Sequence, residues 1–263
     1  MHFTKMHGLG NDYLYYYGDL EEPEKWSIEL SERHFGIGSD GIITISHSDI
    51  ADFKMRIFNA DGSEAMMCGN GIRCVGKYVY DKGYTDKTKL AIETKSGIKY
   101  LTLNTCSGKV KTVMVDMGKC VVSEPVTLET SFGEVKLTPV SMGNPHAVIF
   151  VDDAENAPLT TLGKELEKNP YFPDGVNVEF AQVIDRTNIR MRVWERGSGI
   201  TMACGTGACA TTAAAIAGGY ARNDEDVTIQ LDGGNLNINI HADNTVIMTG
   251  PAKTVCECEV ECK

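Results

Sequence analysis

Long apolar runs are missing from this sequence of 263 residues. No stretch approaches the roughly 18 consecutive apolar residues that a membrane-spanning helix needs. The first seven residues, which begin Met1-His2-Phe3-Thr4, also lack the apolar core of a secretory signal peptide. We therefore expect a cytoplasmic protein that has no membrane segment.

Positive charge is the second deficit of the chain. There are 25 Lys and Arg residues against 36 Asp and Glu residues, which gives a formal net charge of −11. A surface of this sign repels the phosphate backbone of nucleic acids and the headgroups of anionic lipids. Nucleic acid and membranes are therefore not expected partners.

A disulfide framework and a long flexible linker are absent as well. The nine cysteines are odd in number and scattered through a chain of ordinary length, unlike those of small disulfide-rich proteins. In a reducing cytoplasm we expect free thiols, most of them buried. The tail cysteines Cys256, Cys258 and Cys262 could suggest a metal, but no second cluster supplies a fourth ligand at a known spacing. We expect no metal site.

A repeated phrase is the main positive signal. It occurs 136 residues apart, as Met67-Cys68-Gly69-Asn70-Gly71 and as Ala203-Cys204-Gly205-Thr206-Gly207. At the same offset, residues 55–59 match residues 191–195, and Gly83-Tyr84 matches Gly219-Tyr220. An in-frame repeat of this length predicts two copies of one structural unit.

Both copies have the same predicted local structure. A β-rich run (53–58 or 189–194) leads through a glycine-containing turn to the cysteine phrase. A helical stretch follows (72–82 or 208–217) and ends at a glycine. Each phrase cysteine is therefore expected at, or just before, a helix N-terminus.

The remaining pattern is one of short strands and turns, with two further helical segments at 23–34 and 160–167. It predicts an α+β protein of two pseudo-symmetric units, each a curved, mostly antiparallel sheet around a central helix. We place the boundary near residues 117–121. Two like units tend to pack about a local two-fold axis, which predicts an active site in the cleft between them.

The two cysteine phrases have a common chemistry. A helix N-terminus presents unpaired N–H groups, which bind a carboxylate and lower the pKa of an adjacent thiol. Two thiols on opposite sides of a carbon can remove a proton from one face and deliver another to the opposite face, which inverts a stereocentre. A single Cys-Gly-x-Gly phrase is more often a tight turn with a buried cysteine, but two copies in register outweigh that interpretation. Cys74 and Cys209 lie inside the predicted helices and are interpreted as packing residues.

The chain resembles the diaminopimelate epimerase family, whose members use two cysteines and no cofactor. The resemblance spans the chain in the family's order. The matching segments are Lys5-Met6-His7-Gly8-Leu9-Gly10-Asn11-Asp12, residues 58–64, 67–74 and 203–208, Gly143-Asn144-Pro145-His146, Gly175-Val176-Asn177-Val178-Glu179-Phe180 and Trp194-Glu195-Arg196-Gly197.

The resemblance implies an epimerase that interconverts LL- and meso-2,6-diaminoheptanedioate in lysine and peptidoglycan precursor synthesis, without pyridoxal phosphate or metal. Cys68 and Cys204 would be the proton-transfer residues, while His146 and Glu195 would tune the thiols or orient the reacting amino group. The expected substrate-binding residues are Asn11, Asn59, Gly69, Asn70, Asn144, Asn177, Glu195, Arg196, Gly205 and Thr206. The resemblance also returns the C-terminal segment to the first domain, which predicts domains 1–118 with 251–263, and 119–250. A homodimer is left open.

One position departs from the family pattern. Many members have a substrate-contacting glutamine where this chain has Gly41. The first rival function is racemisation of another amino acid, such as proline or histidine; proline racemases usually have His after the first Cys-Gly, whereas Asn70 stands here. The second rival, a non-catalytic amino-acid-binding protein, would not need two cysteines in register, and loss of activity on thiol alkylation would exclude it.

Overall fold

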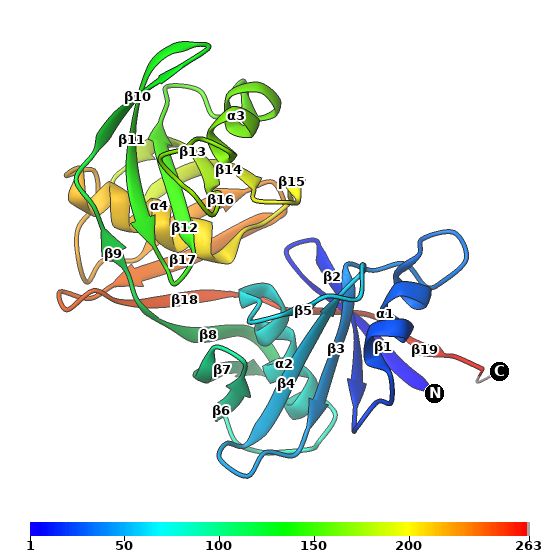
Figure 1. The fold of residues 1–263 in the computed structure, drawn as a ribbon. Helices are drawn as coiled ribbons and strands as arrows, with labels where there is room; N and C mark the ends of the chain where they lie inside the picture. Colours follow the sequence, from blue (N-terminus) through cyan, green and yellow to red (C-terminus); the bar gives the residue numbers. More distant parts are fainter. Residues whose placement is uncertain (262–263) are drawn as a thin grey trace. The chain divides into compact units, whose positions relative to one another are not determined.

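Each half of the chain folds as one mostly antiparallel sheet around one helix (Figure 1). The computed structural model describes residues 1–261. It divides into unit 1, Met1–Val115 with the segment from Gly250 onward, and unit 2, Asp116–Thr249. The architecture confirms the predicted α+β class; the domain division predicted from the sequence, at 118/119 and 250/251, stays a prediction.

Unit 1 is built from these elements: β1 (His2–Gly8), β2 (Asn11–Tyr17), α1 (Pro23–Ser31), β3 (Gly41–Ser46), β4 (Phe53–Asn59), β5 (Glu64–Ala65), α2 (Gly69–Asp81), β6 (Lys89–Thr94), β7 (Gly97–Cys106), β8 (Lys109–Lys119) and β19 (Lys253–Glu259). Neighbouring strands follow the order β19-β1-β2-β3-β4-β6-β7-β8. Only β2 with β3 and β4 with β6 run parallel among these pairs. Helix α2 packs on β1, β2 and β7, inside the curve of the sheet.

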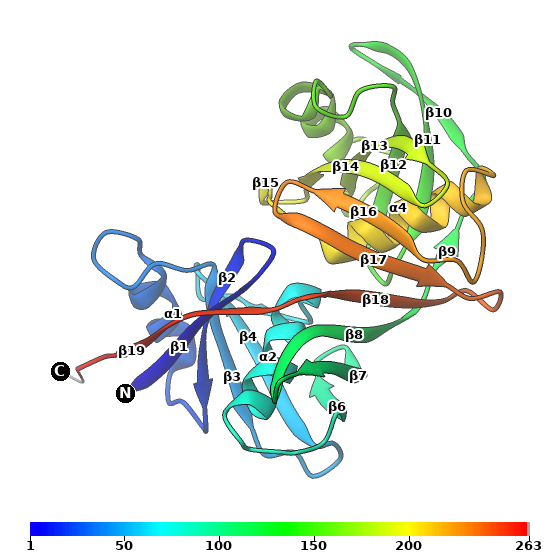
Figure 2. The same ribbon diagram turned by 180° about the vertical axis from the view of Figure 1, so that it is seen from behind.

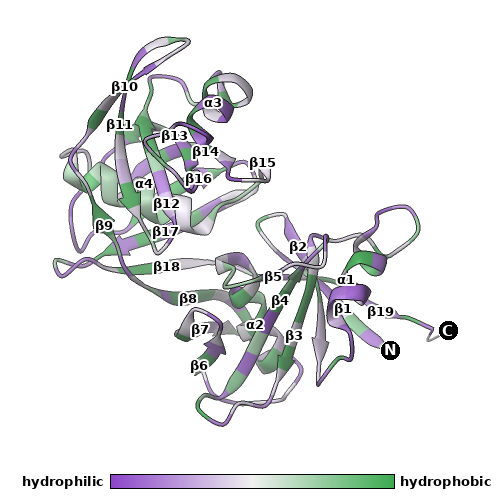
Figure 3. Cartoon of the chain, viewed as in Figure 1, coloured by the Kyte–Doolittle hydropathy of each residue, from purple (hydrophilic) through white to green (hydrophobic). Residues whose placement is uncertain are grey.

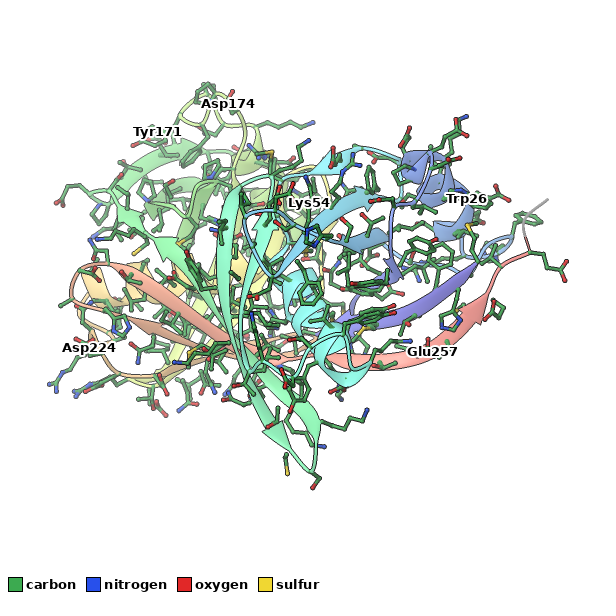
Figure 4. All side chains as sticks on the ribbon, turned by 90° about the horizontal axis from the view of Figure 1, so that it is seen from below. Trp26, Lys54, Tyr171, Asp174, Asp224 and Glu257 are labelled. Atoms are coloured by element: carbon green, nitrogen blue, oxygen red, sulfur yellow. The ribbon has the colours of Figure 1, made fainter. Side chains whose placement is uncertain are left out.

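Strand β19 brings the end of the described chain back to its beginning, as Figure 2 shows from behind. It pairs antiparallel with β1, from His2 opposite Glu259 to His7 opposite Lys253. Glu257 of this strand, labelled in Figure 4, accepts hydrogen bonds from Thr4 at 2.6 Å and Lys82 at 2.9 Å. These contacts tie β19 to β1 and to the end of α2.

Unit 2 is built from β9 (Val121–Val122), β10 (Val126–Thr130), β11 (Gly133–Ser141), β12 (Pro145–Phe150), a π-helical turn (Leu159–Gly163), α3 (Lys164–Glu167), β13 (Asn177–Asp185), β14 (Asn188–Glu195), β15 (Gly199–Ile200), α4 (Gly205–Ala217), β16 (Val227–Leu231), β17 (Gly234–Ile240) and β18 (Thr245–Pro251). Its strands follow the order β11-β12-β13-β14-β16-β17-β18. Again two pairs are parallel, β12 with β13 and β14 with β16. The two units therefore share one topology.

Helix α4 is buried on every side, as its alanine content predicts. All residues from Ala208 to Ala215 are buried, and α4 contacts β11, β12, β13, β14, β16 and β17. Helix α2 is less apolar, since its partly buried Lys77 and Asp81 form an ion pair and bond the backbone of Val110 on β8. Figure 3 shows hydrophobic and hydrophilic residues alternating along the strands, the period expected of a sheet with one face on a core.

The predicted elements differ from the structure at their ends. Both central helices begin three residues earlier than predicted, because the glycine-rich phrases are themselves the first helical turn. Each helix is followed by a left-handed glycine, Gly83 with φ 78° and Gly219 with φ 77°. The segment predicted as one helix over 160–167 is a π-helical turn followed by α3.

Candidate functional site

Cys68 is the N-cap residue of α2. Its backbone is extended, with φ −135° and ψ 117°, and its sulfur accepts a hydrogen bond from Gly71 N at 3.3 Å. A side-chain acceptor at this position satisfies one of the unpaired N–H groups of the first turn. The helix therefore fixes the sulfur beside its own N-terminus.

Cys204 has the same arrangement at the start of α4. Its φ is −110° and its ψ is 110°, and Gly207 N donates to Sγ at 3.3 Å. Cys204 is only 5% exposed. The sequence repeat is thus a repeat of a capped cysteine at a helix N-terminus, once in each unit.

The last glycine of each phrase is required by close packing. A Cβ on Gly71 would lie 2.6 Å from Ile43 Cδ1, and a Cβ on Gly207 would lie 2.7 Å from Glu179 Oε1. Contacts below 3.0 Å force neighbouring atoms to move. The side chains of β3 and β13 thus lie directly beneath the first helical turns.

In unit 1, Asn11 is the predicted binding residue that contacts Cys68. The thiol lies 3.3 Å from Asn11 Oδ1, and Asn11 Nδ2 donates to Asp40 Oδ2 at 2.8 Å. Burial raises the pKa of Asp40, and the hydrogen bond from Asn11 opposes that rise. Asn59, at the end of β4, instead donates to Ser63 Oγ at 3.0 Å.

Arg73 is a structural residue of this half-site to which the sequence pattern assigned no role. It is fully buried, and its guanidinium donates to Gly69 O at 3.1 Å, Asn70 Oδ1 at 3.0 Å and Pro251 O at 3.2 Å. It therefore holds the first turn of α2, including both predicted residues Gly69 and Asn70. The sequence signal for this contact is the spacing of four residues between Gly69 and Arg73, because residues four apart lie on the same face of a helix.

The departure at Gly41 has a structural reason. Gly41 has φ 152°, and a Cβ there would lie 2.1 Å from Phe58 O. Neither the backbone conformation nor the space admits a side chain. The close approach of β3 to the end of β4 therefore excludes the glutamine side chain that many family members have at this position.

In unit 2, Asn144 and Thr206 link Cys204 to His146. Cys204 Sγ is 3.7 Å from Thr206 Oγ1, which accepts from Asn144 Nδ2 at 3.3 Å. Asn144 Oδ1 is 3.2 Å from His146 Nε2. The four residues come from β12, the turn before it and the start of α4.

Glu195, a partly buried residue at the end of β14, is a second neighbour of Cys204. Its carboxylate accepts a hydrogen bond from the Thr201 hydroxyl. Burial raises the pKa of Glu195, while hydrogen bonds from Thr201 and Cys204 oppose the rise.

Two more of the predicted binding residues of unit 2 contact each other. Asn177 Oδ1 accepts from the backbone N of Arg196 at 3.0 Å, and the Arg196 guanidinium donates to Asp174 O at 2.9 Å.

The expectation of a lowered thiol pKa is wrong for Cys204. Burial raises the pKa of Cys204 well above its ordinary value, and the carboxylates of Glu195 and Glu179 raise it further. The hydrogen bonds from Thr206 and Gly207 N lower it by less. A buried thiol next to two carboxylates keeps its proton.

Neither a metal cluster nor a membrane helix is found in residues 1–261. No three His, Cys, Asp or Glu side chains within that range are grouped to hold a metal ion, and no helix within it is both long and apolar enough to span a bilayer. Cys256 and Cys258 have their sulfurs 3.7 Å apart. Cys262, the third cysteine of the tail, lies outside the described residues.

Comparison with known proteins identifies the family. The sequence model described as Diaminopimelate epimerase matches residues 3–123 and 138–255. A protein of Bacteroides thetaiotaomicron named diaminopimelate epimerase is 54% identical, covering 98% of this chain and 97% of its own length. One of Bacillus subtilis with the same name is 50% identical, covering 97% and 96%.

Solved structures show the same fold at much lower identity. A probable proline racemase of Agrobacterium radiobacter K84 superposes with a TM-score of 0.78 at 18% identity, covering all of this chain and 93% of the other. A predicted epimerase of Pseudomonas aeruginosa has a TM-score of 0.74 at 17% identity, covering 100% and 99%. The likenesses to solved structures establish the fold alone. The sequence matches establish the family: this chain belongs to the diaminopimelate epimerase family.

Proposed function

We propose that this protein is an isomerase that interconverts LL- and meso-2,6-diaminoheptanedioate by proton transfer between Cys68 and Cys204. Membership of the family supports the reaction, which belongs to lysine and peptidoglycan precursor synthesis. The observation that carries the two-base chemistry is the pair of equivalent N-cap cysteines, each bonded to the third N–H of its helix.

The proposed reaction needs both sulfurs at one substrate carbon. One cysteine, as thiolate, takes the α-proton, and the electron pair left on carbon delocalises into the α-carboxylate. The other cysteine, as thiol, delivers its proton to the opposite face. The two sulfurs have then exchanged protonation states, and exchange with water resets them before the next turnover in the same direction.

The helix N-termini are the proposed site of the α-carboxylate. Gly71 N and Gly207 N are bonded to the cysteine sulfurs. We assign the backbone N–H groups of the preceding pairs, Gly69-Asn70 and Gly205-Thr206, to the carboxylate oxygens. Charge that develops there in the transition state is stabilised by aligned N–H dipoles.

The remaining predicted residues would hold the rest of the substrate. A diamino diacid has two carboxylates and two ammonium groups, so its site needs anion donors and ammonium acceptors at both ends. Arg196 can grip a carboxylate with two parallel hydrogen bonds. The proposed set is Asn11, Asn59, Asn144, Asn177, Glu195 and Arg196, with His146 and Glu195 acting on the reacting end.

A substrate panel tests the function. The protein is incubated with LL-diaminoheptanedioate, L-proline and L-histidine, and the products are resolved by chiral chromatography. We expect the meso isomer from the first substrate and no D-isomer from the other two. Racemisation of proline or histidine alone would favour the rival racemase function, and inertness towards all three would favour a binding protein.

Two further properties go beyond the reaction: the cytoplasmic location stays a prediction from the sequence, and the homodimer stays an open possibility. A cytoplasmic location and a homodimer are not decided by the fold of a single chain. Light scattering of the purified protein across a concentration series measures the oligomeric state directly.

A further inference from the structure

Glu179 is a buried carboxylate that no expectation from the sequence assigned to the site. It lies on β13, opposite Val148 of the parallel strand β12, and is fully buried. Its Oε1 lies 2.6 Å from Nδ1 of His146, which is also fully buried. Because an ionised carboxylate only accepts, Nδ1 carries the shared hydrogen. Within residues 1–261, Glu179 Oε2 has no hydrogen-bond partner.

The fold does not need a carboxylate at this place. The position 136 residues earlier is Ile43, which is also fully buried. Ile43 Cδ1 lies under Gly71 of α2 as Glu179 Oε1 lies under Gly207 of α4, with Cβ distances of 2.6 and 2.7 Å. Burying a carboxylate costs free energy that an aliphatic side chain does not. An isoleucine thus builds the same packing without that cost.

His146 also has a non-ionic counterpart in unit 1. Leu14 faces Ile42 across the parallel pair of unit 1, and Ala147 faces Val178 across that of unit 2. One residue earlier, Tyr13 therefore occupies the place of His146. Unit 2 carries a buried acid–imidazole pair where unit 1 carries a tyrosine and an isoleucine.

We propose that Glu179 is a positioning residue of the reaction, which fixes the His146 imidazole and keeps the proton on Cys204, so that this half-site starts as the proton donor. The proposal rests on the proposed two-cysteine function. It extends that function by making the two half-sites unequal before substrate binds.

The charges around Cys204 agree with a resting thiol. The groups that face it are Glu195 from β14, Glu179 from β13 and, through Asn144 and Thr206, His146 from β12. Glu179 Oε1 and Cys204 Sγ lie close to one common point, because a Cβ on Gly207 would be 2.7 Å from the first and 3.2 Å from the second. Helix α4 itself has no charged side chain. Burial first, then Glu195 and Glu179, raise the pKa of Cys204.

The test is the pH dependence of Cys204 alkylation in Glu179→Gln. The amide keeps the shape and an acceptor for His146 Nδ1 but removes the negative charge. Iodoacetamide labelling is followed at the Cys204 peptide by mass spectrometry, in a Cys68→Ala background so that no substrate chemistry intervenes. We expect the midpoint of the alkylation rate against pH to fall by about one pH unit. Alkylation of Cys204 should then be about tenfold faster at pH values below the midpoint.

A matched control and a second variant keep the test decisive. Glu165→Gln removes an exposed carboxylate of the same unit, which bonds Ser131, and should leave the midpoint unchanged. Glu179→Ile reproduces the packing of unit 1, and its alkylation midpoint should shift in the same direction as that of Glu179→Gln. If one of these two variants folds poorly, the other still provides the test. An unchanged or raised midpoint in a folded Glu179 variant overturns the proposal.

Kinetics separate positioning from mere structural support. With Cys68 intact, Glu179→Gln should lower kcat with little change in KM, and should move the alkaline limb of the kcat/KM profile to lower pH, because the donor loses its proton earlier. A loss that is equal at every pH contradicts the proposal. If the wild-type chain fails the substrate panel yet the alkylation midpoint shifts, the proposed function fails while the coupling of Glu179 to Cys204 stands.

Discussion

At the scale of single residues, four cysteines of the two central helices allow a controlled comparison of helix-capping and helix-interior positions. Cys68 and Cys204 cap their helices, whereas Cys74 and Cys209 lie inside the same helices and are fully buried. Cys68→Ala or Cys204→Ala should each lower kcat by about 10²-fold or more, because each removes an obligatory proton-transfer group.

The helix-interior cysteines supply the comparison. Cys74→Ala and Cys209→Ala should cost about 1 kcal/mol of unfolding free energy, measured in urea, with activity per folded molecule retained. Burial raises the pKa of Cys74 to about 11, so it should also resist alkylation at neutral pH. Near-normal turnover in Cys204→Ala would contradict the pairing.

At the same scale, the sequence predicts the two cysteines that cap the helices but not the buried charged residues around them. Cys68 and Cys204 were found because their phrases repeat in register. Glu179 and Arg73 stand within segments that match the family, but the pattern predicts no role for them, because a charged residue in a strand or helix is usually exposed. Only the fold shows that both are fully buried.

At the scale of elements, the junction of β3 and β4 should not tolerate a side chain at Gly41. Gly41→Gln places a Cβ 2.1 Å from Phe58 O and imposes φ 152° on a residue with a side chain. Backbone strain of this kind costs about 1–3 kcal/mol, and the clash adds to it. Urea unfolding should show the loss.

The control for this prediction is another left-handed glycine of unit 1. Gly108 has φ 71°, and a Cβ on it would meet no atom within 4 Å. Gly108→Gln therefore measures the conformational cost without the clash. Equal losses in the two variants would show that the carbonyl of Phe58 does not decide the residue at 41.

Element by element, the strands and central helices followed from their patterns, and the exceptions have causes. The helix ends were misplaced because glycine weakens a helix prediction, whereas here Gly69 and Gly71 are tolerated by capping and by contacts from β3. The 160–167 segment has helical composition, but its first turn is a π-helical one. Pattern alone carries no signal for that widening.

At the scale of the whole molecule, the two-base proposal predicts where product hydrogen comes from. In deuterated water, the product α-carbon should carry deuterium from the first turnover, because the donating thiol has exchanged with solvent. Unreacted substrate should stay unlabelled over the same early interval. Mass spectrometry of separated isomers measures both, and early product that keeps the substrate's own hydrogen would indicate a single shuttling base.

The strand registers have a practical consequence for protein engineering. From β3 to the central helix the halves correspond at an offset of 136, but β2 and β12 correspond at 133, as the pairs Leu14 with Ile42 and Ala147 with Val178 require. Suppose that β2 is exchanged for β12 at the 136-residue offset of the sequence repeat. Every side chain of the grafted strand would then lie three positions away from its structural counterpart. Because a strand alternates its faces with each residue, such a graft would turn core residues outward. A chimera must therefore be cut between β2 and β3, because the offset changes between these two strands.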